Sequence, residues 1–247
     1  MVAEKSGTSS TERQKTKNFS NFALSHMDAM RILRDGKVLG PESEGWRNIA
    51  EHCLLAGVTA YTLGKLVGLS QEDLQELTNV ALTHDWDKRL QKEQTQSEKT
   101  RTAGGLVMTE TDSKTLDQMG RGKHGIERVT GHDLRDFDTW NTKEKIMRFV
   151  DSCLGTEPDG RAVLQNWHER FEGLRKRSPR MNIDVGNELY GGVPLFDKLE
   201  EITQIVEKEL FEQVIKNNPG LFTKYLTPSD LLMMTESAIL ADAEKEK

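Results

Sequence analysis

The sequence predicts an all-α protein, on two observations. Apolar residues recur at steps of three and four along several segments, as they do on the buried face of an amphipathic helix. No segment alternates apolar and polar residues over the length of a half-buried strand. Charged residues make up 30% of the chain and hydrophobic residues only 35%, so we expect helices with broad polar faces.

Composition and charge argue against several classes of function. The net charge of −6 disfavours electrostatic capture of nucleic acid or of an anionic membrane. No apolar run reaches the roughly 18 residues of a transmembrane helix, and the first residues lack the apolar core of a secretory signal. Two cysteines, Cys53 and Cys153, make no disulfide framework, which is typical of a reducing compartment. We therefore expect a cytoplasmic protein without membrane or nucleic-acid partners, and the sequence leaves open whether it forms a homo-oligomer.

Three regions are expected along the chain. Residues 1–17 are rich in Ser, Thr, Lys and Glu and predict a disordered N-terminal tail. A helical domain at 18–216 opens with a short helix at about 18–33. Residues 217–247 are expected to form a C-terminal helical extension, whose last helix begins near Pro228 because proline is favoured at the first position of a helix.

Two consecutive helices, at about 43–67 and 71–90, are expected next. Each has one apolar face with helical spacing. Gly68 ends the first helix, and Ser70 with Asp73 resembles a capping box at the start of the second.

A polar segment, residues 91–122, then interrupts the pattern. It is rich in Gln, Thr, Ser, Lys and Gly and has few apolar residues. Two interpretations are equally compatible with this composition: a mobile lid beside a functional site, or a disordered insertion without a role.

Helices resume at about 142–154 and 159–176, and a long one begins at Leu195. The basic residues at 170–180 are interleaved with glutamates, which predicts a solvated helix end. The whole pattern corresponds to a helical bundle with a polar insertion and additional C-terminal helices.

Four ionisable residues lie on the apolar faces of three predicted helices, where such residues are uncommon. They are His52, then His84 with Asp85, and finally Asp151. Each alone is as well explained by a core hydrogen bond or a salt bridge, but together they suggest a shared site. Buried carboxylates are costly unless they meet positive charge or a metal ion. His nitrogen and Asp oxygen suit a divalent cation such as Zn, Mn, Fe or Co.

In their order and character, these motifs resemble the HD superfamily of metal-dependent phosphohydrolases. The matching segments are AEHCLLAGVTAYTL around His52, NVALTHDWDKR around His84 and Asp85, and KIMRFVDSC around Asp151, within residues 43–156. The resemblance implies an HD-domain helical bundle in which these four residues hold one or two divalent ions, with Mn, Co, Mg, Zn and Fe as candidates. It also implies a phosphomonoesterase or phosphodiesterase that acts on a small phosphorylated substrate, with a nucleotide favoured.

The resemblance also suggests roles in catalysis and substrate binding. Asp85 would bind the metal and help to orient the attacking water. Lys88 matches a lysine that many family members carry three residues after the His-Asp pair, and with Arg89 it would hold phosphate oxygens. The alternative for Lys88 is an intrahelical pair with Asp85 or His84. Arg47 follows a tryptophan and would bind phosphate, because a guanidinium fork suits it, or would be an ordinary surface arginine.

His124 and His132 bear on a second metal ion. Binuclear HD proteins place extra histidines between the His-Asp pair and the final Asp, where these two residues lie. Adjacent glycines favour the alternative that both are ordinary loop histidines. If both bound metal, the chain would instead fit an HD-type di-iron oxygenase. A third hypothesis is a non-catalytic HD domain that binds a nucleotide or a partner protein.

Overall fold

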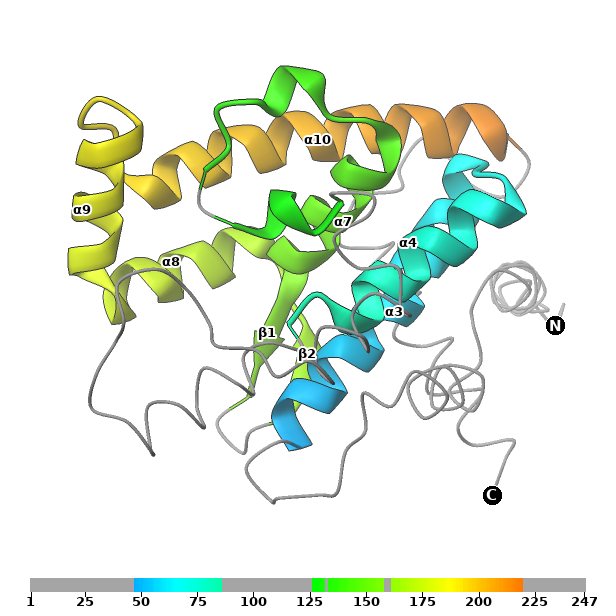
Figure 1. Ribbon diagram of the computed structural model, residues 1–247, viewed down its shortest axis with the longest axis horizontal. Coiled ribbons are helices and arrows are strands. Elements are labelled where there is room, and N and C mark those ends of the chain that lie inside the picture. Colours follow the sequence, from blue (N-terminus) through cyan, green and yellow to red (C-terminus); the bar gives the residue numbers. More distant parts are fainter. Residues whose placement is uncertain (1–46, 86–125, 132, 158–160, 220–247) are drawn as a thin grey trace, which may run out of the picture.

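The computed structural model describes residues 47–85, 126–131, 133–157 and 161–219 (Figure 1). Helices dominate these residues, so the prediction of an all-α fold is confirmed. The α-helices are α3 (Arg47–Val67), α4 (Gln71–Thr83), α7 (Thr142–Cys153), α8 (Trp167–Arg177), α9 (Pro179–Leu189) and α10 (Leu195–Asn217). Two short 3-10 helices, η2 (Ile126–Thr130) and η3 (Phe137–Thr139), precede α7.

Helices α3 and α4 form a tight pair. The connection turns at Gly68, whose φ of 89° lies in the left-handed region that favours glycine. Ser70 then caps α4, as predicted, and its side chain accepts a hydrogen bond from the Asp73 main-chain N–H at 3.1 Å. Gly57 and Gly64 of α3 lie against leucine side chains of α4, so the two backbones approach closely. This close approach positions residues at the end of α4 beside the first turns of α3.

Helix α7 packs against this pair. Asn141 caps it, and Glu144 completes a capping box. The ammonium of Lys143 lies 2.7 Å from Asp73 and 2.5 Å from Glu76, which joins the beginning of α7 to the beginning of α4. The predicted helix at 142–154 is therefore present and ends one residue earlier.

The predicted helix at 159–176 is wrong in its first part. The chain instead forms a two-stranded antiparallel sheet from β1 (Leu154–Thr156) and β2 (Ala162–Leu164), and α8 begins only at Trp167. Asn166 caps α8, because its side chain accepts a hydrogen bond from the His168 N–H. Strands of three residues are too short to show an alternating pattern, which explains why periodicity missed them. Helix α9 was also not predicted.

Helix α10 packs across α7 and covers one side of the bundle (Figure 1). Its predicted apolar face is confirmed, since the following side chains are all buried in the core: Leu195, Leu199, Ile202, Val206 and Leu210. At its end, the side-chain amides of Asn217 and Asn218 donate to the carbonyls of Val67 and Leu66 at the end of α3. Helices α3 and α10 are thereby joined at their C-terminal ends.

Among the described residues, no helix combines the length and apolarity needed to cross a membrane. Several expected segments lie outside the described residues and stay predictions. These are the tail at 1–17, the helix at 18–33, the insertion at 91–122 and the helix that begins near Pro228.

Candidate metal centre

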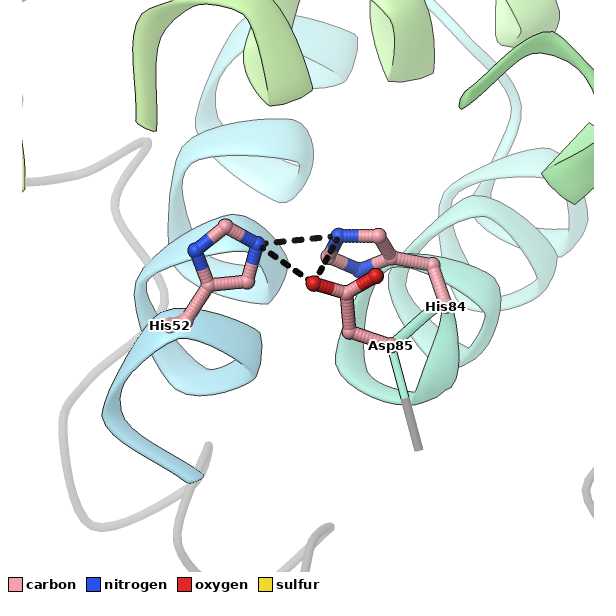
Figure 2. Close-up of side chains that lie close together, drawn as sticks. All are labelled: His52, His84 and Asp85. Carbon is pink, nitrogen blue, oxygen red and sulfur yellow. Dashed lines mark hydrogen bonds and ion pairs between the residues drawn. The ribbon is translucent and has the colours of Figure 1, made fainter. Parts of the chain in front are cut away.

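Three helices bring two histidines and two aspartates together. His52 lies in the second turn of α3, His84 caps the C-terminal end of α4, and Asp85 follows directly. Asp151 lies in the last turn of α7. Figure 2 shows the rings of His52 and His84 facing one another, with the Asp85 carboxylate between them. The side chains that the sequence places on apolar helix faces therefore meet at one point.

The ligand atoms of these side chains are close to one another. His52 Nε2 lies 3.1 Å from His84 Nε2 and 3.2 Å from Asp85 Oδ2. The distance from His84 Nε2 to Asp85 Oδ2 is 3.8 Å. Asp151 Oδ1 lies 3.9 Å from His52 Nε2 and 3.6 Å from His84 Nε2. Both histidines thus present the same ring nitrogen to the Asp85 carboxylate, and the Asp151 carboxylate lies beside the two imidazoles.

These distances fit a metal ion. Ligands bound at about 2.1 Å lie about 3.4 Å apart around a tetrahedral ion and about 3.0 Å apart at adjacent octahedral positions. The observed separations, from 3.1 to 3.9 Å, include the tetrahedral value, and the shortest of them lies just above the octahedral one. Nitrogen and carboxylate oxygen donors suit Zn, Mn, Fe or Co. The group of His52, His84 and Asp85 could therefore hold a metal ion, and Asp151 offers a further oxygen beside it.

The four side chains differ in their access to solvent. The His84 side chain is fully buried, whereas 12% of His52 and 13% of each aspartate is exposed. His84 therefore forms the inner end of the group, and the other three residues have edges that face solvent.

A main-chain contact orients His84. Its Nδ1 lies 2.8 Å from the carbonyl oxygen of Ala81, one turn earlier in α4. Because a carbonyl can only accept, Nδ1 carries a hydrogen, and in the neutral ring Nε2 keeps its lone pair. This arrangement is typical of metal-binding histidines, whose second nitrogen is held by a carbonyl or a carboxylate.

The two histidines have opposite pKa shifts. Burial lowers the pKa of His52, although its hydrogen bond to Asp85 acts in the other direction. Burial also disfavours the charged form of His84, but the contact with Asp151 and the charges of both aspartates outweigh it and raise its pKa. Without a metal ion, the carboxylates thus favour a proton on His84, and metal binding would displace that proton.

Two arginines flank Asp151, and neither was predicted to belong to the site. The Nη1 group of Arg170 in α8 donates to the Asp151 main-chain carbonyl. Arg148, one turn before Asp151, is buried and donates from Nη1 to the Val129 carbonyl at 3.1 Å. Burial alone would raise the pKa of Asp151, but His84 and these two guanidinium groups hold it well below its ordinary value. Burial lowers the pKa of Arg148 itself to about 10.

The prediction for Arg170 is therefore wrong. It was included in a solvated helix end, yet it is half-buried and contacts Asp151. The sequence spacing indicated that Arg170 lies on the buried side of α8, because it comes one turn after Trp167 and directly before Phe171, which are both buried. For Arg148, its place inside an apolar run of α7 indicated that it is buried.

The side chains of the remaining candidate residues are not described by the structure. Arg47 is the first residue of α3, and its side chain is not among those described. The residues Lys88, Arg89, His124 and His132 lie outside the described residues, so their proposed roles stay predictions.

No match was found among models of protein families, among curated proteins or among solved structures.

Proposed function

We propose that this protein is a metal-dependent phosphohydrolase of the HD type that acts on a small phosphorylated molecule, with a nucleotide favoured. The observation that carries the proposal is the convergence of His52, His84, Asp85 and Asp151 from three helices. The order of these residues along the chain, and the character of the segments around them, resemble the HD motifs.

The partly exposed ligands favour a catalytic site over a structural one. Structural zinc sites are closed by four protein ligands, whereas catalytic sites keep a position for water or substrate, and four protein ligands leave two such positions on a six-coordinate ion. Three of the four side chains here have solvent-exposed edges, and only His84 is fully buried. The group also contains two carboxylates and no cysteine, a donor set that is not specific to structural zinc.

The four residues have distinct roles in this proposal. His52 and His84 bind the ion through Nε2, and His84 is held by the Ala81 carbonyl. Asp151 binds from α7. Asp85 binds the ion and orients the attacking water. A divalent ion bound there supplies Lewis acidity, which lowers the pKa of water and neutralises developing phosphoryl charge.

Substrate binding is assigned to cations that are close to the candidate ligands in the sequence. Lys88 and Arg89 follow Asp85 within four residues, and Arg47 begins the helix that carries His52. A protonated lysine cannot bind a metal ion, so Lys88→Ala should reduce turnover or substrate affinity and leave the metal content unchanged. A variant that lost its metal would show that Lys88 supports the structure of the site.

An activity screen tests the proposal. The purified chain is stripped with a chelator and reloaded separately with Mn, Co, Mg, Zn or Fe. Each form is mixed with nucleoside monophosphates, deoxynucleoside triphosphates, cyclic nucleotides and a generic phosphomonoester. We expect hydrolysis that needs the metal and stops when the chelator is restored.

Other outcomes would contradict the proposal. Metal binding without hydrolysis of any substrate would indicate a non-catalytic binding domain. Oxygen consumption by the iron form alone would indicate the di-iron oxygenase.

A further inference from the structure

We propose that Arg170 is a positioning residue, which holds Asp151 in the orientation that binds the metal ion. This inference rests on the metal-binding part of the proposed function, and it does not depend on which reaction the site performs. It assigns to α8 a role in a site whose four ligands all come from other segments of the chain.

Arg170 contacts the chain at the end of α7. Asp151 lies in the last turn of α7, and its carbonyl accepts the main-chain N–H of Leu154. At Leu154 the backbone becomes extended, with φ −86° and ψ 123°, and leaves the helix. The Nη1 group of Arg170 donates to the same Asp151 carbonyl. Arg170 thus joins α8 to the turn that ends α7 and carries the ligand.

Arg170 also places a positive charge at the C-terminal end of α7. The C-terminal end of a helix carries partial negative charge, which disfavours a carboxylate in the last turn. Helix α7 has Asp151 in its last turn and no basic residue there. Arg170 supplies the positive charge from a different helix. The guanidinium of Arg148 donates instead to the Val129 carbonyl.

The packing of α8 in the core fixes the position of Arg170. Trp167 and Phe171, on the same side of α8, are buried in the core. The Trp167 indole N–H also donates to Glu207 of α10 at 3.1 Å. Within the described part of the chain, Arg170 has no ion pair with a carboxylate side chain, so its hydrogen bond to the Asp151 turn is its defined contact.

Arg175 offers a matched control. It lies in the same helix and is also partly buried, and its guanidinium binds Asp197 and Glu200 of α10. Arg175 therefore also fastens α8 to the bundle, and within the described residues its ion pairs are with α10. A loss of metal affinity that follows only from weaker packing of α8 would appear in variants of both arginines.

The experiment compares the full-length wild type with Arg170→Met, Arg170→Lys and Arg175→Met. Mn²⁺ affinity is measured by calorimetry, the absorption spectrum of bound Co²⁺ reports the ligand geometry, and thermal unfolding in chelator reports the metal-free stability. We expect Arg170→Met to weaken Mn²⁺ binding at least tenfold, the usual effect of removing a group that orients a ligand, and to alter the Co²⁺ spectrum. Arg170→Lys, which keeps a charge and a donor, should recover most of the affinity. Arg175→Met should bind Mn²⁺ within about twofold of the wild type, whatever stability it loses, because it leaves these ligand-orienting contacts intact.

Three results would overturn the inference. One is wild-type affinity and an unchanged Co²⁺ spectrum in Arg170→Met. Another is an equal loss of affinity in Arg175→Met, which would show a general effect of α8 packing. The third is a wild-type protein that binds no metal ion, which would also overturn the candidate centre. Bound metal without hydrolysis would contradict only the proposed function, so the two failures can be distinguished.

Discussion

The Nε2 atoms of His52 and His84 lie 3.1 Å apart, although the two residues are separated by 32 positions in the sequence. Two nitrogen lone pairs at this distance repel each other unless a proton or a cation lies between them. The Asp85 and Asp151 oxygens nearby add negative charge. The pair is therefore stabilised by positive charge at this point, and a divalent ion supplies more of it than a proton.

Metal binding should raise the stability of the folded chain. An ion that binds only the folded state adds about 2.7 kcal/mol at a free concentration one hundred times its dissociation constant. We expect the melting temperature to rise with added Mn²⁺ or Zn²⁺ and to fall again with chelator, as measured by scanning calorimetry. Equal melting temperatures in metal and in chelator would contradict the candidate centre.

Asp85→Ala should abolish metal-dependent hydrolysis and leave the helical far-UV circular dichroism largely unchanged, because Asp85 lies beyond the end of α4. Asp184→Ala, which removes an exposed carboxylate from α9, is the matched control and should keep full activity. Full activity of Asp85→Ala with metal still bound would contradict the assigned role.

Asp151→Asn should weaken metal affinity by about tenfold or more, since the change removes an anionic ligand oxygen and preserves the shape of the side chain. Calorimetric titration with Mn²⁺ measures this effect. An unchanged affinity would show that Asp151 is not a ligand.

The two histidines should differ in their effect on stability. Both His52→Ala and His84→Ala should lose metal binding. His84→Ala also removes a buried hydrogen bond to the Ala81 carbonyl, so we expect it to lower the free energy of unfolding in chelator by a further 1–3 kcal/mol or so. Urea titration of the metal-free proteins measures this difference. A larger loss in His52→Ala would contradict it.

The close contact of α3 and α4 should be needed for metal binding. A Cβ at Gly57 would lie 2.6 Å from Leu82 Cγ, and Leu82 is buried and cannot easily move. Gly57→Ala should therefore separate the helices, lower the free energy of unfolding by about 1–3 kcal/mol and weaken metal binding.

Gly173→Ala is the control for this prediction. A Cβ at Gly173 in α8 meets only Arg177 Nη2, at 3.9 Å. Because alanine favours the helix more than glycine does, this variant should gain up to about 1 kcal/mol. Denaturant unfolding and metal titration of both variants test the pair. A Gly57→Ala protein with wild-type stability and affinity would show that the helix contact is not limiting.

Local signals in the sequence were enough to predict α3, α4, α7 and α10 and the inward-facing residues of the candidate metal centre. The apolar spacing of α3, α4 and α10 and the cap at Ser70 depend on residues within one or two turns, so a single segment contains them. The positions of His52, His84 and Asp151 on apolar faces follow from the same periodicity. The side chains of the candidate metal centre could therefore be predicted before their distances were known.

Contacts between distant segments determined the features that the sequence did not predict. The short strands around residue 160 form because β1 and β2 pair with each other, and no period predicts a pairing of three residues. Arg170 looked like part of a charged helix end, and only the packing of α8 against α7 brings it to the Asp151 carbonyl. Likewise, the 3.1 Å between His52 and His84 depends on how closely Gly57 lets two helices approach. Hydrophobic periodicity tells which face of a helix is buried, but the partner that covers that face is set by the packing of the whole chain.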